Sequence, residues 1–151
     1  MDAVDRKLLD ALRGNARATY AELARAVGLS APAAHERVAK LEASGVITGY
    51  HAAVAPESLG YSMSALVGVF LSDTANPDEV AAQLESLSSV EDCWFVAGEE
   101  SFVVKVRVLD IAGLELAIRA ITQMRGVART RSTVVLSTRF EGRVQAAGQP
   151  A

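Results

Sequence analysis

The stretch LSAPAAHERVAKLEASG, residues 29–45, predicts an amphipathic helix whose first turn carries only small side chains. Ser30 is placed to cap this helix, and Pro32 is compatible with its start because first-turn amides have no partner within a helix. Three apolar residues recur at helical spacing and predict a buried face: Ala34, Val38 and Leu41. So slim a first turn allows the helix to come very close to another molecule.

Two shorter helices are predicted before this one. The first carries its apolar residues on one face and ends at Gly14 and Asn15: Val4, Leu8, Leu9 and Leu12. The second begins at Thr19, which forms a T-x-x-E capping box with Glu22, and it ends at Gly28. Two short helices joined by a few residues that include a glycine have the pattern of a helix-turn-helix.

The segment VITGYHAAV, residues 46–54, is rich in β-forming residues and favours a short extended wing after the third helix. Pro56 and Gly60 follow it and predict a hinge. The N-terminal part of the chain is therefore predicted to be a winged helix-turn-helix domain.

From residue 64 onwards the pattern changes to strands that alternate with helices. Strands are predicted at 64–72, 90–97, 102–109 and 127–140, and helices at 76–87 and 110–124. The order β-α-β-β-α-β is that of a ferredoxin-like domain, in which both helices cover one face of an antiparallel sheet. The other face of the sheet must then meet solvent or a partner.

The predicted fold class is therefore α+β, with a winged helix-turn-helix domain followed by a ferredoxin-like domain. The predicted boundaries are residues 1–50 for the first domain, 51–63 for a linker, 64–141 for the second domain and 142–151 for a loose tail. A chain of 151 residues is long enough for two small domains, each with its own core.

Composition narrows the possible functions. The lone Cys93 and the two histidines cannot supply a four-ligand zinc site, and no other cofactor motif is present. No stretch reaches the roughly 18 apolar residues of a membrane helix, and the start of the chain is too acidic for a secretory signal, so a cytoplasmic protein is expected. The net charge of −3 gives no support to nucleic-acid binding by itself.

A DNA-binding function must therefore follow from arrangement within the first sixty residues, where seven basic residues balance seven acidic ones. In a helix-turn-helix, the start of the second helix enters the major groove, where small and polar side chains meet base edges and cations hold phosphates. The candidate residues for contact with double-stranded DNA are Thr19, Ser30, Ala31, Pro32, Ala33, His35, Glu36, Arg37 and Lys40. The alternative is that the small residues only allow two helices to pack closely.

Three segments together carry a resemblance to a known family: DRKLLDALRGNARATYAELARAVGLSAPAAHERVAKLEASGVITGY at 5–50, VAGEESFVVKVRV at 96–108 and RTRSTVVL at 129–136. They resemble the leucine-responsive/asparagine-responsive (Lrp/AsnC) family of transcription regulators over residues 2–140. The resemblance implies a DNA-binding regulator, not an enzyme, with a domain that senses a small effector, expected to be an amino acid. It also implies homodimers formed sheet against sheet, assembled further into octamers of four dimers.

The resemblance further implies an effector site near the loop between the two middle strands. The loop residues are Gly98, Glu99, Glu100 and Ser101, and the family's second cluster corresponds to Thr130, Arg131 and Ser132. Backbone amides near Gly98 are suited to a carboxylate, and a glutamate is suited to an ammonium group. An exposed acidic turn of ordinary function is the alternative interpretation of the loop.

The sequence gives less support to three other functions. A ferredoxin-like enzyme lacks a catalytic constellation here, because neither histidine lies near the cysteine in the sequence. An RNA-binding module would stack bases on aromatic residues of its central strands, and FVVKVRVL offers only Phe102. Metal sensing is disfavoured by the shortage of cysteine and histidine.

Overall fold

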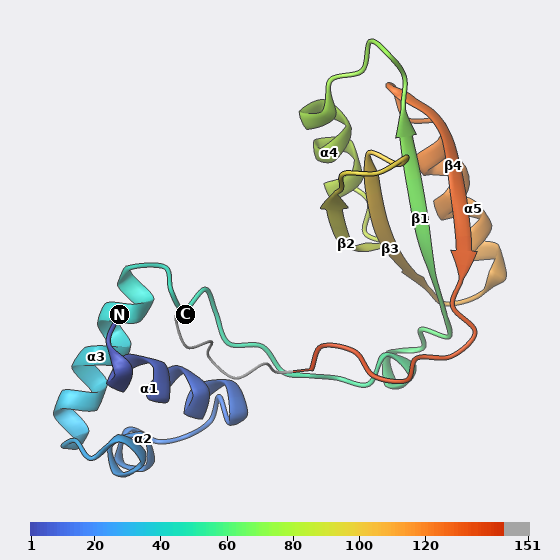
Figure 1. The fold of residues 1–151 in the computed structure, drawn as a ribbon. Helices are drawn as coiled ribbons and strands as arrows, with labels where there is room; N and C mark the ends of the chain where they lie inside the picture. The colour runs from blue at the N-terminus through green and yellow to red at the C-terminus, as the bar shows by residue number, and fades with distance from the viewer. Residues whose placement is uncertain (144–151) are drawn as a thin grey trace. The chain divides into compact units, whose positions relative to one another are not determined.

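The computed structural model of the protein describes residues 1–143, which form two compact units (Figure 1). The first is built on Met1–Ala53 and the second on Val54–Arg139, and each is described by itself. The division between Ala53 and Val54 falls inside the segment predicted as a linker, residues 51–63. The predicted tail, residues 142–151, lies almost entirely outside the described residues.

Three helices make up the first unit: α1 (Ala3–Gly14), α2 (Tyr20–Val27) and α3 (Ala31–Ala43). Each begins at a side chain that accepts a hydrogen bond from a first-turn amide, namely Asp2, Thr19 and Ser30. The capping box of Thr19 and Glu22 is present as predicted, and Asp2 forms a second one with Asp5 that the sequence analysis did not identify. These caps fix where each helix starts.

The core of the first unit consists of the apolar faces that helical spacing predicts. The buried residues are Leu8, Leu12, Leu23, Ala24, Ala34 and Val38. Between α2 and α3 the chain turns at Gly28, whose φ of +73° lies in the left-handed region that side chains disfavour. The helix-turn-helix is therefore confirmed, with the predicted inner face of α3 turned to the core.

Residues 46–54 form no strand, so the prediction of an extended wing is wrong. The amides of Val46 and Ile47 both donate to the carbonyl of Leu41, and Ile47 packs against the helical core. β-forming residues need a second strand to pair with, and this segment has none within the described unit. It therefore follows the end of α3 as irregular chain.

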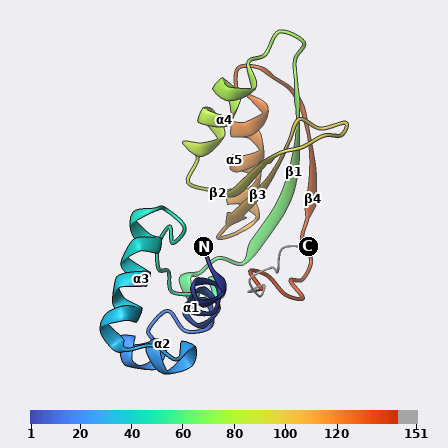
Figure 2. The same cartoon turned by 60° about the vertical axis from the view of Figure 1, so that its left-hand side comes forward.

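The second unit has the predicted β-α-β-β-α-β order (Figure 1). After a short 3-10 helix, Pro56–Leu59, its elements are β1 (Met63–Leu71), α4 (Pro77–Glu85), β2 (Val90–Phe95), β3 (Phe102–Val108), α5 (Ile111–Thr122) and β4 (Val127–Val134). The strands form one antiparallel sheet in the order β2-β3-β1-β4. Helices α4 and α5 lie together on one face of that sheet (Figure 2).

Alternation along the strands divides the sheet into a covered face and an open face. The covered face joins the two helices in one core, in which the buried residues include Val67, Val69, Val104, Val106, Leu84 and Ile121. The open face carries the alternate residues of the central strands, among them Leu66, Gly68, Phe70 and Lys105. Lys105 is only 9% exposed there, and its ammonium group pairs with Glu91 at 2.8 Å, which offsets the cost of burying the charge.

Two details of the second unit differ from the sequence predictions. The last strand was predicted to reach residue 140, but β4 ends at Val134, which pairs with Ala65 near the start of β1. Beyond that pair β1 offers almost no further partner, and Leu136 is 96% exposed. The helix predicted at 76–87 spans Pro77–Glu85 as α4, and Glu79 within it pairs with Arg125 at 2.5 Å.

Replacing Gly28 by Ala is expected to destabilise the first unit by about 1–2 kcal/mol, the cost of a left-handed L-residue. No atom lies within 4 Å of the added Cβ, so the cost comes from the backbone conformation alone. Hydrogen exchange of the α2 and α3 amides measures it. Gly14→Ala, at an equally open position within α1, is the matched control and should be neutral or slightly stabilising.

Candidate nucleic-acid interface and effector site

The N-terminal end of α3 presents a slim and partly exposed turn. The amide of Ala33 donates to the Ser30 hydroxyl at 3.3 Å, while Pro32 is exposed and Ala31 and Ala33 are half-buried. Pro32 has no amide and the amide of Ala33 is engaged, so this end offers a phosphate few free donors. The small side chains of this turn allow close approach to a DNA groove, whereas its backbone amides are poorly suited to binding an anion.

An aromatic pair lies beside this turn. The rings of Tyr20 and His35 meet edge to face, with centroids 4.5 Å apart. Tyr20 is 41% exposed, and the sequence analysis missed it. The available signal was a large aromatic residue directly after the Thr19 cap and outside the apolar face of α2. The Thr19 hydroxyl donates to the Glu22 carboxylate at 2.9 Å, so it serves the helix cap.

Lys40 forms an exposed ion pair with Glu36 one turn earlier in α3. The two groups are 2.8 Å apart, and their side chains are 74% and 69% exposed. The hydrogen bond from Lys40 lowers the pKa of Glu36 below its ordinary value. A pair this exposed contributes little to stability, because water competes for both charges. Lys40 can therefore exchange Glu36 for a phosphate at small cost.

Arg37 is engaged much more firmly than Lys40. Its Nη1 atom lies 2.7 Å from Asp2 Oδ2 and 2.7 Å from Asp5 Oδ1, both at the start of α1. These two hydrogen bonds raise the pKa of Arg37. The backbone amide of Asp5 and then the Arg37 guanidinium lower the pKa of Asp2 to about 2. Asp2 thus stays charged at neutral pH, and the two carboxylates hold Arg37 between α1 and α3.

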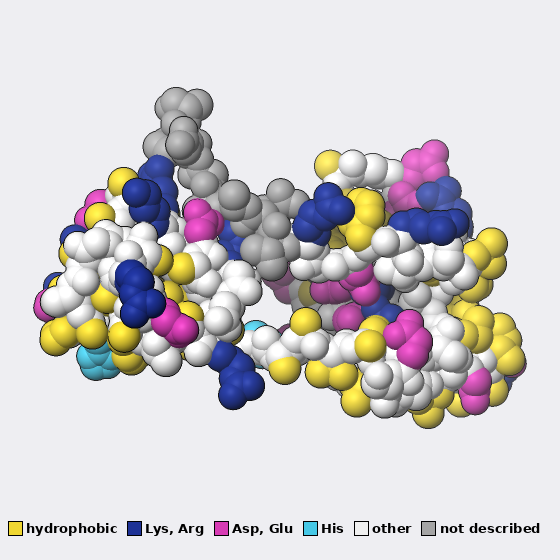
Figure 3. All heavy atoms as spheres, turned by 90° about the horizontal axis from the view of Figure 1, so that it is seen from below, with side chains coloured by type: hydrophobic (Ala, Val, Ile, Leu, Met, Phe, Trp, Pro, Cys, Tyr) yellow, Lys and Arg dark blue, Asp and Glu magenta, His cyan; other side chains and the backbone are white. Residues whose placement is uncertain are grey.

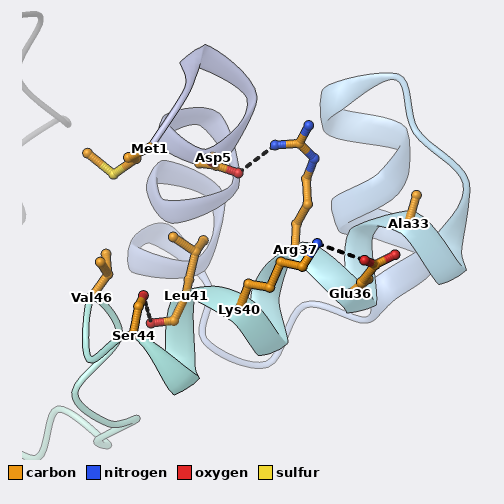
Figure 4. Close-up of a pocket in the computed structure, with 9 residues that line it drawn as sticks. All are labelled: Met1, Asp5, Ala33, Glu36, Arg37, Lys40, Leu41, Ser44 and Val46. Atoms are coloured by element: carbon orange, nitrogen blue, oxygen red, sulfur yellow. Dashed lines mark hydrogen bonds and ion pairs between the residues drawn. The ribbon is translucent and has the colours of Figure 1, made fainter.

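These side chains border a groove between α1 and α3, with a volume of about 510 Å³ (Figure 4). Figure 4 shows Arg37 directed towards Asp5 on α1, while Lys40 lies along α3 beside Glu36. The remaining lining residues are Met1, Ala33, Leu41, Ser44 and Val46. The groove places cations and carboxylates next to one another on the flank of α3.

Charge on the first unit is dispersed. On the face seen in Figure 3, lysine and arginine side chains of the described residues lie apart from one another, among acidic and apolar ones. This agrees with the balance of seven basic and seven acidic residues in the first sixty. Sequence-independent attraction to DNA is therefore modest, and shape and individual contacts must carry recognition.

In the second unit, the structure brings the predicted effector loop to the predicted partner strand. The β2–β3 hairpin is closed by the amide of Val96, which donates to the Ser101 carbonyl at 3.0 Å. The Ser101 amide donates to the Val69 carbonyl on β1. Glu100 then reaches across β1 and forms a short ion pair with Arg131 on β4, and Glu99 lies 4.0 Å from the same guanidinium.

Gly68 makes this crossing possible, although the sequence analysis did not select it. It lies on β1 between Val103 of β3 and Arg131 of β4. A Cβ at this position would lie 2.7 Å from Glu100 Cγ, which is closer than real contacts allow. The signal was present in the sequence, because an isolated glycine inside an apolar strand indicates close approach by another group.

Thr130 and Ser132 do not join the loop. Along β4 they alternate with Arg131, so they face the covered side of the sheet when Arg131 faces the open side. The Thr130 hydroxyl lies 2.9 Å from the Thr122 hydroxyl of α5, which confirms its direction. The predicted cluster of three residues is therefore divided between two faces, and Arg131 alone joins the glutamates through its side chain.

Within residues 1–143, no three histidine, cysteine, aspartate or glutamate side chains are grouped so that they could hold a metal ion. None of the helices in this described part of the chain combines the length and apolar character that crossing a membrane requires.

Comparison with known proteins identifies both units. An AsnC-type helix-turn-helix domain matches residues 1–42, and an Lrp/AsnC ligand binding domain matches residues 64–145. The transcriptional regulator LrpA of Mycobacterium tuberculosis is 43% identical over 143 residues, which cover 95% of each chain. The regulatory protein AsnC of Escherichia coli is 36% identical over 137 residues, which cover 90% of each.

Solved structures give the same result for the fold. A feast or famine regulatory protein of Mycobacterium tuberculosis, in complex with L-methionine, superposes with a TM-score of 0.90 at 42% identity, covering 97% of this chain and 99% of that one. The structure of AsnC from Escherichia coli superposes with a TM-score of 0.86 at 34% identity, covering 95% and 97%.

Gly68→Ala is expected to destabilise the second unit by about 1–3 kcal/mol, because the new methyl group displaces Glu100 from Arg131. In a Glu100→Ala background the obstructing Cγ is gone, so the same change should cost little. Urea unfolding followed by fluorescence of Trp94, the chain's one tryptophan, measures both costs. Equal costs in the two backgrounds would contradict the assigned contact.

Proposed function

We propose how this chain, which belongs to the Lrp/AsnC family of DNA-binding transcriptional regulators, contacts DNA and senses its effector. Membership confirms the expectation of a regulator that combines a helix-turn-helix with an effector domain. The relatives are regulators and not enzymes, so the expectation that the chain is no enzyme is confirmed as well. Membership also argues against the alternatives of a ferredoxin-like enzyme and an RNA-binding module.

DNA docks on α3 in this proposal, with the first turn of the helix in the major groove. The observation that carries it is the exposure of Pro32, His35 and Glu36 on a turn that Ser30 caps. A small first turn brings the helix backbone close to the base edges, and the neighbouring larger side chains then meet those edges. We assign the phosphate contact on this helix to Lys40, whose ion pair is exposed and easily exchanged.

Tyr20 joins this surface in the proposal. Its ring lies against His35, and its hydroxyl is on a side chain that is 41% exposed. A tyrosine at the start of the first helix of the motif is suited to a phosphate, since that helix crosses the backbone in such complexes. His35 then borders both the backbone and the groove.

The effector is an amino acid in this proposal, bound beside the loop of Gly98–Ser101. Support comes from the related regulator that binds L-methionine and from the charges gathered at this loop. Glu99 has a side chain that is 80% exposed and is suited to an α-ammonium group. Arg131, 60% exposed, is suited to the carboxylate, in addition to the backbone amides near Gly98.

The protein assembles, in this proposal, as homodimers formed through the open face of the sheet, and the dimers assemble further into octamers. Leu66 and Trp94 lie on that face and are 40% and 48% exposed. Exposed apolar side chains on an uncovered sheet favour pairing with a second copy. A regulator acts where the chromosome is, and we therefore place the protein in the cytoplasm.

The docking of α3 predicts how DNA binding depends on salt. Lys40→Ala should weaken binding to every sequence and make the slope of log K against log salt shallower by about 0.9 for each protomer on the duplex, the value of one phosphate contact. Fluorescence anisotropy of a labelled duplex over a range of salt concentrations measures the slope. Arg125→Ala, which removes an exposed cation from the second unit, is the control and should leave the slope unchanged.

The effector site predicts selective stabilisation by one or a few amino acids. In a thermal-shift screen of the twenty amino acids, a ligand at 100 times its Kd should stabilise the native state by about 2.7 kcal/mol. Gly98→Leu should abolish the shift, and sedimentation velocity should still detect dimers. The nearest atom to an added Cβ is Glu100 Oε2 at 3.9 Å, so the substitution does not force the fold apart. A retained shift would remove the assignment of this loop.

A further inference from the structure

We propose that Asp2 and Asp5, named here the acidic cap of α1, hold Arg37 away from DNA phosphates and so limit sequence-independent binding. Arg37 is then a positioning residue that ties α3 to α1, and not a phosphate contact. The inference rests on the proposed docking of α3 on DNA. It also replaces the expectation from the sequence that Arg37 and Lys40 act alike.

The acidic cap is held in place before DNA arrives. Asp2 Oδ1 accepts hydrogen bonds from the amides of Val4 and Asp5, and Asp5 Oδ2 accepts one from the amide of Asp2. The oxygens left over, Asp2 Oδ2 and Asp5 Oδ1, both meet Arg37 Nη1 at 2.7 Å. Each carboxylate therefore caps the helix with one oxygen and binds the guanidinium with the other.

Releasing Arg37 to a phosphate would cost two charge-assisted hydrogen bonds. It would also leave Asp5, whose side chain is only 15% exposed, without its cationic partner. A poorly exposed carboxylate that loses its cation is strongly disfavoured. The phosphate would have to replace both bonds while it approached two negative charges, and Coulomb repulsion opposes that approach.

Lys40 provides the contrast on the same helix. It has one carboxylate partner, Glu36, and both side chains are largely exposed (Figure 4). Exchange of that partner for a phosphate trades one solvated ion pair for another. Arg37 and Lys40, three residues apart on α3, therefore have different roles. The physical difference is that Arg37 pairs with two carboxylates and Lys40 with one.

The consequence for the regulator concerns sequence-independent binding. Every phosphate contact adds affinity for any sequence, whereas base contacts add affinity for the correct one. Withholding Arg37 removes one contact of the first kind while the groove-facing turn of α3 stays in place. Affinity falls by the same factor for every sequence, so base contacts alone set the ratio of specific to non-specific binding, and the protein is held less tightly on non-specific DNA.

The test compares full-length variants on a random-sequence duplex, with anisotropy measured over a range of salt concentrations. The doubly substituted Asp2→Asn, Asp5→Asn variant keeps oxygens that cap α1, because asparagine is also a good N-cap, but it releases Arg37. We expect tighter binding than wild type and a slope of log K against log salt that is steeper by about 0.9 for each protomer on the duplex. Adding Arg37→Gln to this variant should return the slope to the wild-type value.

Two controls separate release of Arg37 from a general gain of positive charge. Asp10→Asn with Glu42→Gln makes the same change in net charge within the first unit and should leave the slope unchanged. Arg37→Gln alone should lower the melting temperature and leave the slope unchanged as well. A slope that becomes shallower by about 0.9 per protomer in Arg37→Gln would overturn the inference, because Arg37 would then already contact phosphate.

The same measurements distinguish failure of this inference from failure of the docking model. If Lys40→Ala flattens the salt dependence but the doubly substituted variant matches wild type, the acidic cap has no such effect and only the inference is overturned. If Lys40→Ala also leaves the slope unchanged, the proposed docking of α3 is wrong and the inference is overturned with it. The doubly substituted variant carries the test even where Arg37→Gln fails to fold.

Discussion

Within residues 1–143, each helix buries one face and helices cover only one face of the sheet, and the functional surfaces follow from that constraint. Three helices bury one stripe each around Leu8 and Val38, and the sheet buries one face beneath α4 and α5. Chains this short have too few layers to cover both sides of every element. The outer face of α3 and the open face of the sheet remain available, and they are the surfaces to which we assign DNA and the second copy of the chain.

In the first unit, to which we assign DNA binding, the arrangement of charges weakens the attraction to DNA more than it strengthens it. Arg37 and Lys40 on α3 both have acidic partners. On the face seen in Figure 3, the described unit shows no continuous basic surface. Strong non-specific attraction would hold a regulator on the many wrong sites of a chromosome. A balanced charge with a slim first turn instead favours recognition through fit to the groove, which agrees with the net charge of −3.

In the effector unit, one glycine connects the loop to the strand across the sheet. Because Gly68 has no side chain, Glu100 can lie over β1 and reach Arg131, so residues more than thirty positions apart form one charged group. The group lies at the end of the hairpin, next to the open face that we assign to assembly. A ligand that binds there can influence how copies associate, which offers a direct connection between effector and oligomer.

The sequence by itself determined the helices, the strands, their order and the division into two units, because periodicity, caps such as Ser30 and Thr19, and glycines such as Gly28 act over a few residues. It also predicted, in part through the family resemblance, an effector site at the loop of Gly98–Ser101 and a DNA contact on the outer side of α3. Tertiary structure alone decided which polar side chains meet: Arg37 with the carboxylates that begin α1, Glu100 with Arg131, and Thr130 with Thr122 of α5 instead of the loop. Long flexible side chains pair with residues that are close in space but distant in the sequence. Neither the spacing of residues nor the composition predicts which of them lie close together. The prediction of an extended wing at residues 46–54 was wrong for the same reason, because a strand needs a second strand to pair with and the local sequence does not show whether one is present.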